Sequence, residues 1–123
     1  MDLDLVGREI VDGAIKVHRV FGPGLLESAY ERALAHELSR RGFEVRTQVA
    51  LPVIYEGTRL GIGYRLDLVV EGSIVIEVKA VERLLPIHQA QLISYLKLGK
   101  YPLGYLMNFH EYLLKDGLRR FAN

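Results

Sequence analysis

The stretch Ile62–Ala80, IGYRLDLVVEGSIVIEVKA, decides the fold. Apolar residues alternate along Ile62–Val70, and Ser73–Ala80 has a similar pattern of β-forming residues. Between them, the short segment Glu71-Gly72-Ser73 carries a central glycine, which is typical of a hairpin loop. The stretch therefore predicts two antiparallel strands joined by a tight turn.

The hairpin places charged residues on one face. If Val70 pairs with Ile74, Asp67 lies opposite Glu77, and Lys79 follows two residues further along the same face. Opposed residues of an antiparallel pair lie about 4.5 to 5.5 Å apart at Cβ, where like charges destabilise the sheet. We therefore expect a cation between the two carboxylates, and a hard ion such as Mg²⁺ favours carboxylate oxygens.

A simpler interpretation of the same hairpin is a solvated polar face. In that case Asp67 and Glu77 only pair with Arg65 and Lys79. An E-x-K triplet arises in strands by chance, so the hairpin alone does not separate the two interpretations.

The composition is that of a single folded domain over residues 1–123, with half of the residues apolar and a quarter charged. A formal net charge of +1 excludes a strongly basic nucleic-acid-binding arm. The absence of cysteine excludes disulfides and thiolate metal sites. The acidic N-terminus and the lack of an apolar run of about 20 residues favour a cytoplasmic protein that does not enter membranes.

The rest of the chain predicts helices around a sheet. The expected order is two helices, three strands, a helix, a strand and a final short strand. This order predicts an α/β (α+β) fold with a mixed sheet flanked by helices. Pro52 predicts that the first strand is irregular or lies at an edge of the sheet. The expected elements are helices over Leu3–Phe21, from about Leu25 to Gly42 and over Pro86–Leu98, strands over Phe43–Tyr55, Ile62–Val70, Ser73–Ala80 and Leu103–Phe109, and a short strand at Leu118–Phe121.

Two helices carry further candidate site residues. Glu27 is in register with Tyr30 and Leu34, so we expect it to face the sheet as a third acidic group, unless it only complements the helix dipole. Gln91 and Tyr95 form a polar ridge on the third helix. The ridge is typical of a site, although a glutamine and a tyrosine satisfied in the core give the same pattern. His88 extends the ridge by one turn, and His18 is a lone histidine on the first helix.

These motifs resemble a known family. Gly24-Leu25-Leu26-Glu27-Ser28-Ala29-Tyr30 matches the signature of the GxxExxY family, which Gly22-Pro23 and Asn108-Phe109 also resemble. Asp67, Glu77-x-Lys79 and Gln91-x-x-x-Tyr95 resemble the core motif of the PD-(D/E)xK nuclease superfamily in its RecB-like form. Leu66 stands where the superfamily's name has proline, and His110 stands where we expect glycine.

The resemblance implies a restriction-endonuclease-like fold and Mg²⁺-dependent hydrolysis of phosphodiester bonds, with Mn²⁺ as an alternative ion. It implies nucleic acid, chiefly DNA, as the partner, and a homodimer is a further expectation by analogy. The site residues would be Glu27, Asp67, Glu77, Lys79, Gln91 and Tyr95. Glu27, Asp67, Glu77 and the Val78 carbonyl would hold the metal.

Two other classes of function stay open at this point. A nuclease-like scaffold can bind nucleic acid or protein without catalysis, which predicts salt-sensitive binding without turnover. A purely structural subunit predicts affinity for neither metal nor nucleic acid.

Overall fold

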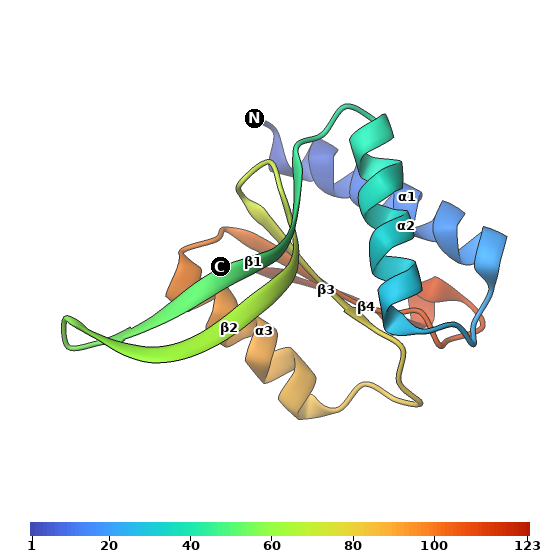
Figure 1. The fold of residues 1–123 in the computed structure, drawn as a ribbon. Coiled ribbons are helices and arrows are strands. Elements are labelled where there is room, and N and C mark those ends of the chain that lie inside the picture. The colour runs from blue at the N-terminus through green and yellow to red at the C-terminus, as the bar shows by residue number, and fades with distance from the viewer.

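The computed structural model describes all 123 residues, and a five-stranded sheet organises them (Figure 1). The strands lie side by side in chain order. The pairs β1/β2, β2/β3 and β4/β5 are antiparallel and β3/β4 is parallel. The mixed sheet flanked by helices is thus confirmed. The elements are α1 (Leu3–Phe21), α2 (Glu27–Arg40), β1 (Val45–Tyr55), β2 (Thr58–Val70), β3 (Ile74–Lys79), α3 (Pro86–Gly99), β4 (Leu103–Asn108), the 3-10 helix η1 (Leu114–Gly117) and β5 (Leu118–Ala122).

The sheet separates two hydrophobic cores. Helices α1 and α2 cover one face, where Ile10 and Leu34 are among the fully buried side chains. Helix α3 covers the other face through Leu92 and Leu96. Figure 1 shows α1 and α2 on one side of the sheet and α3 on the other. Because β3 has a helix over each face, Ile74–Val78 is buried throughout, and the apolar run there follows from this position.

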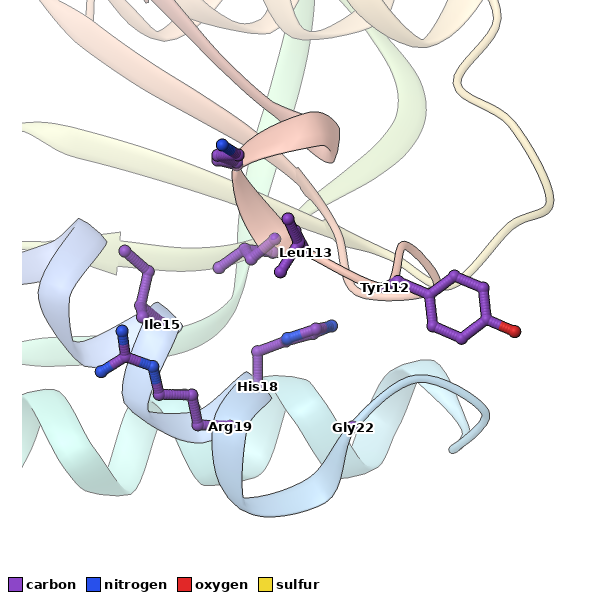
Figure 2. A pocket seen from close by; sticks show the side chains of 8 residues that line it. Ile15, His18, Arg19, Gly22, Tyr112 and Leu113 are labelled. Atoms are coloured by element: carbon purple, nitrogen blue, oxygen red, sulfur yellow. The ribbon is translucent and has the colours of Figure 1, made fainter.

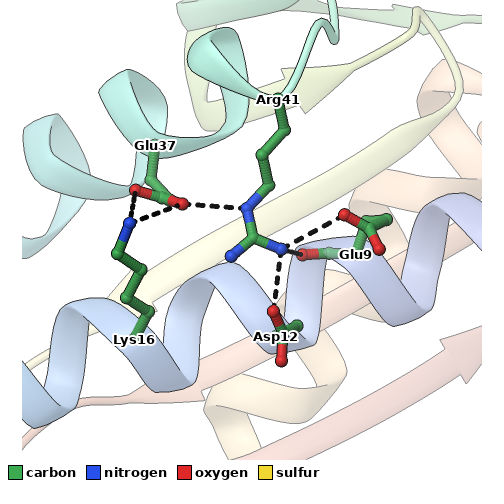
Figure 3. Close-up of polar contacts among 5 residues, drawn as sticks. All are labelled: Glu9, Asp12, Lys16, Glu37 and Arg41. Carbon is green, nitrogen blue, oxygen red and sulfur yellow. Dashed lines mark hydrogen bonds and ion pairs between the residues drawn. The ribbon is translucent and has the colours of Figure 1, made fainter.

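A cluster of ion pairs joins α1 to α2 (Figure 3). Glu37 of α2 accepts from Lys16 at 3.1 Å and from Arg41 at 2.9 Å. Arg41 also reaches back to α1, where it pairs with Asp12 at 2.9 Å and Glu9 at 3.2 Å. The charged residues of α1 thus lie off its apolar stripe and fix the second helix against it.

The first helix ends at Phe21, as the sequence predicts, but the second helix begins later than predicted. Helix α2 begins at Glu27, not Leu25, and Leu26 is its N-cap with 78% of its surface exposed. Phe21 at the end of α1 is likewise 45% exposed, although both residues continue an apolar stripe. The reason is the Gly22–Gly24 connection, where Gly22 and Gly24 adopt positive φ and turn the chain before the second helix starts.

The first strand lies at the edge of the sheet, as Pro52 predicts, and its register with β2 shifts between Pro52 and Ile54. Beyond this point β1 and β2 continue as an exposed two-stranded arm up to the Glu56-Gly57 turn (Figure 1). No helix of the chain is long and apolar enough to cross a membrane.

Candidate active site

Asp67 lies where β2 separates from β3. The ladder between these strands runs from Val70↔Ile74 to Leu68↔Ile76, which continues to Asp67 opposite Glu77. At this point the Asp67 side chain accepts from the backbone N–H of Val78, with 2.8 Å between Oδ2 and N. The predicted register is therefore confirmed, and a carboxylate oxygen caps the open end of the ladder.

The alternation of β2 is interrupted at Asp67. Leu66 packs in the core beneath α3, whereas Leu68 packs in the core beneath α1 and α2. Residues two apart in a regular strand point to the same side of the sheet. Because Leu66 and Leu68 point to opposite sides, the regular alternation of side chains is broken at Asp67. The neighbouring strand β1 is irregular at the same point of the ladder. Gln48, which lies opposite Asp67 in the register, has a φ of 50°. Such irregularities re-aim side chains near functional sites.

Glu77 is a buried carboxylate, only 7% exposed. Its Oε1 lies 3.4 Å from the backbone nitrogen of Asp67, whose N–H donates to it. Burial, followed by the negative charge of Asp67, raises the pKa of Glu77 to about 9. The two carboxylates are thus held together in a place that disfavours the charged form of Glu77.

All of the predicted side chains except Glu27 meet in one small cavity of about 160 Å³. The cavity is lined by Asp67, Glu77 and Lys79 from the two strands and by Gln91 and Tyr95 from α3. The polar ridge of α3 therefore faces the hairpin, as expected. Burial and the nearby Glu77 raise the pKa of Tyr95.

The simpler interpretation of the hairpin does not hold. Arg65 and Lys79 line the same cavity, yet neither forms a salt bridge with Asp67 or Glu77. The salt bridges of the chain lie elsewhere, between α1 and α2 and between Arg120 and Asp4. The paired carboxylates thus lack a bonded cation.

Glu27 does not face the sheet, and that expectation is wrong. Because α2 begins at Glu27, this residue is exposed in the first turn. Glu31, one turn later, is half-buried and takes the position toward the sheet. Gln48 donates to Glu31 Oε1 at 2.7 Å and lies 3.5 Å from Asp67 Oδ1. Burial and the charge of Asp67 raise the pKa of Glu31 to about 7, and Glu27 adds a smaller effect.

Sequence reasoning missed Glu31 and Gln48 for different reasons. Glu31 follows Glu27 by four residues, so both lie on the same face of the helix. The helical period that predicts Glu27 to face the sheet therefore predicts the same of Glu31. Nothing in the sequence marks Gln48, because its left-handed backbone conformation is set by neighbouring strands.

His88 has a larger role than its place in the first turn suggests. Its Nδ1 accepts from the backbone N–H of Leu85 at 3.0 Å, and the ring lines the cavity. With Nδ1 accepting, the neutral ring carries its proton on Nε2.

Tyr30 is structural. Its hydroxyl donates to the Gly22 carbonyl and accepts from the Leu25 N–H at 3.0 Å, and its ring stacks on Phe109 at 4.7 Å. The tyrosine thus fixes the loop that precedes α2. His18 is also structural: it is buried and its Nε2 lies 2.7 Å from the Glu111 carbonyl.

Asn108 supports the site from behind. It is fully buried, and its amide both accepts from and donates to the backbone of Val81, at 3.0 and 2.8 Å. Its Oδ1 also accepts from the His110 N–H at 3.3 Å. These bonds hold the segment that leaves β3 directly after Lys79.

A second cavity, of about 460 Å³, lies away from the carboxylates, between α1 and the segment after β4 (Figure 2). Ile15, His18 and Arg19 of α1 line it, and Tyr112 points out of it. None of its lining residues is acidic, so it does not offer the oxygen ligands of a Mg²⁺ site.

The donor set of the first cavity fits a hard divalent ion. Asp67 and Glu77 present carboxylate oxygens side by side, and burial together with the charge of Asp67 raises the pKa of Glu77, so a cation bound there would be stabilising. No group of three or more His, Asp and Glu side chains is arranged to hold an ion. An ion there would thus have two side-chain ligands and keep several waters, which suits Mg²⁺.

Comparison with known protein families agrees with this arrangement. The model of the PD-(D/E)XK nuclease superfamily matches residues 4–121. The chain belongs to this superfamily. Searches of curated proteins and of solved structures give no match. Membership in the PD-(D/E)XK superfamily accounts for the mixed sheet flanked by helices.

Proposed function

We propose that the protein is a metal-dependent nuclease that hydrolyses phosphodiester bonds, with DNA as the expected substrate. The observation that carries the proposal is the cavity in which Asp67 and the buried Glu77 meet Lys79 without forming a salt bridge. Such a costly arrangement is typical of active sites. As a finer proposal, the protein is a member of the GxxExxY family within the superfamily, which the signature at Gly24–Tyr30 supports.

Asp67, Glu77 and the Val78 carbonyl would hold Mg²⁺, with Mn²⁺ as an alternative. Glu31, rather than the exposed Glu27, is the α2 carboxylate nearer to this pair, and Glu27 would act only through water. A bound ion polarises the scissile phosphate and lowers the pKa of bound water.

The remaining cavity residues act on the water and the phosphate. The Lys79 ammonium orients the attacking water and offsets the negative charge that develops on the phosphate oxygens. Gln91 and Tyr95 donate hydrogen bonds that position the phosphate against the hairpin. His88 Nε2–H adds a third donor from the same helix.

The proposal is tested with labelled single-stranded DNA, duplex DNA and RNA in Mg²⁺ or Mn²⁺. Wild-type protein is expected to cut at least one of them, and EDTA is expected to stop the reaction. Asp67→Asn and Glu77→Gln should abolish cleavage, while Lys79→Met should lower its rate by about 10² to 10⁴-fold.

Asp116→Asn is the matched control for Asp67→Asn, because Asp116 is an exposed carboxylate in η1 and does not line the cavity. It should cut as wild type does. Full cleavage by Asp67→Asn, or cleavage in EDTA, would contradict the proposal.

A binding module is the second candidate function. One observation favours it: no three Asp, Glu or His side chains are arranged to bind a metal ion. Salt-sensitive binding of nucleic acid that continues without turnover in every metal would support this function over hydrolysis.

A further inference from the structure

An apolar groove adjoins the catalytic cavity. It has a volume of about 310 Å³ and lies between the β1/β2 arm and α3. Gln91 and Tyr95 line both the groove and the catalytic cavity, so the two spaces lie side by side. Most of the other lining is apolar and includes Val53, Tyr64, Ile87 and Leu98.

Two aromatic rings meet in this groove. Tyr64 of β2 and Tyr95 of α3 have ring centroids 5.4 Å apart and planes inclined at 43°. Tyr64 is 41% exposed, so part of its surface is open to a ligand. The Tyr64 ring belongs to a strand and packs on a helix, which preorders it for stacking.

The strands and the helix that form the groove carry more basic than acidic residues. Residues 45–66, which form β1 and most of β2, contain Arg46, Arg59 and Arg65 but only one acidic residue, Glu56. Helix α3 has no acidic residue, and Lys97 and Lys100 lie at its C-terminal end. The chain as a whole carries a formal charge of only +1, so positive charge is concentrated on these elements. This concentration complements a polyanion.

The arm also exposes apolar side chains beyond the groove. Ile54, Tyr55, Leu60 and Ile62 are each between 46% and 64% exposed. Aromatic and apolar surface on elements that carry a net positive charge matches single-stranded nucleic acid, whose unpaired bases stack on rings while its phosphates bind cations. A duplex keeps its bases stacked inside and cannot use such a surface in this way.

Resting on the proposed nuclease function, we propose that the groove binds an unpaired base of a single-stranded nucleic acid by stacking on Tyr64. The phosphate next to that base then enters the cavity of Asp67 and Glu77 through the shared Gln91 and Tyr95. The preferred substrate is accordingly a single strand or an unpaired end.

The test is fluorescence anisotropy with a labelled 12-nucleotide single strand and with the same strand annealed to its complement. All proteins carry Glu77→Gln, so no strand is cut and one carboxylate charge is removed. Tyr64→Ala should weaken single-strand binding by about 5- to 150-fold, because stacking contributes about 1–3 kcal/mol per base. Tyr64→Phe keeps the ring and should bind within about twofold of the parent.

Tyr112→Ser is the matched control, since Tyr112 is 89% exposed and lies outside the groove. It should leave binding unchanged, and the weaker duplex binding should not respond to Tyr64→Ala. Single-strand binding that ignores Tyr64→Ala, or a groove occupied by a second copy in a Tyr64-dependent dimer, would overturn the inference.

The readout needs no turnover, so it separates the two proposals. Tyr64-dependent single-strand binding in a protein that never cleaves would contradict only the nuclease function. Metal-dependent cleavage without any effect of Tyr64 would contradict only the stacking site.

Discussion

At the scale of one residue, the burial of Glu77 beside Asp67 lowers the free energy of unfolding. Its carboxylate is buried against Asp67, and in the metal-free protein no cation is bonded to the pair. Glu77→Gln keeps an acceptor at Oε1 and adds an amide that can donate to Asp67. We expect this variant to raise the free energy of unfolding by about 1–3 kcal/mol near pH 7, since one pKa unit corresponds to ~1.4 kcal/mol.

Urea unfolding in EDTA measures this effect. Glu56→Gln, at an exposed carboxylate, is the control and should change the stability by less than about 0.5 kcal/mol. A Glu77→Gln protein that is less stable than wild type would show that the carboxylate pair is not repulsive.

Asn108 carries a second prediction at this scale. Asn108→Ala removes three hydrogen bonds to backbone groups of Val81 and His110 and leaves those groups without partners. The free energy of unfolding should fall by about 2–3 kcal/mol. Asn123→Ala provides the comparison, because Asn123 also bonds two backbone carbonyls but is exposed at the end of the chain. A loss no larger than that of Asn123→Ala would refute the supporting role of Asn108.

The residues of the site could be predicted only where strand and helix periods decide their direction. Asp67, Glu77 and Lys79 follow from the period of two and one register, and Gln91 and Tyr95 follow from the helical period. Glu27 was misplaced because Glu27 and Glu31 lie on the same helix face, and the sequence does not show that the helix begins at Glu27 and leaves that residue exposed. Gln48 could not be found, since neighbouring strands impose its backbone conformation.

At the scale of the element, the pairing of α1 and α2 depends on charge as well as on the apolar stripe. Lys16 and Arg41 lower the pKa of Glu37, and no carboxylate lies among its bonded partners. A carboxylate whose pKa falls on folding stabilises the fold above its unfolded pKa of 4.5, and this stabilisation is lost as the pH falls through the lower, folded value.

Glu37→Gln should therefore lower the free energy of unfolding at pH 7 and have little effect near pH 3. Urea unfolding at the two pH values measures the difference. Glu9 and Asp12 contact Arg41 and not Glu37, so Asp12→Asn is the control for the rest of the cluster. An equal effect of Glu37→Gln at both pH values would contradict an electrostatic origin.

Most elements could be predicted from the sequence because local patterns and tertiary packing agree. The period-two pattern of β2 and β3 and the stop signals around α3 match the observed bounds to within a few residues. The interruption at Asp67 and Gln48 could not be predicted, because it arises where two strands leave the main sheet together. The short η1 helix before β5 was also missed, since four residues carry no periodic signal.

At the scale of the whole molecule, the site lies where helices from both faces of the sheet come close to the same residues. The alternation of β2 is broken at Asp67, so α2 approaches the carboxylates from one face of the sheet and α3 approaches them from the other. The exposed β1/β2 arm extends from the same point and forms the groove beside the cavity. The fold thus brings acidic groups, hydrogen-bond donors and a partly aromatic groove to one place.

The most direct test of this account is thermal melting of the wild-type protein and Asp67→Asn during titration with Mg²⁺ and Mn²⁺. A bound ion stabilises the folded state by mass action, so the wild-type Tm should rise by several degrees at saturating, millimolar metal. Asp67→Asn keeps an acceptor for the Val78 N–H but loses the charge, and its Tm should not respond. No shift in the wild type, or an equal shift in both proteins, would contradict a metal site at Asp67 and Glu77.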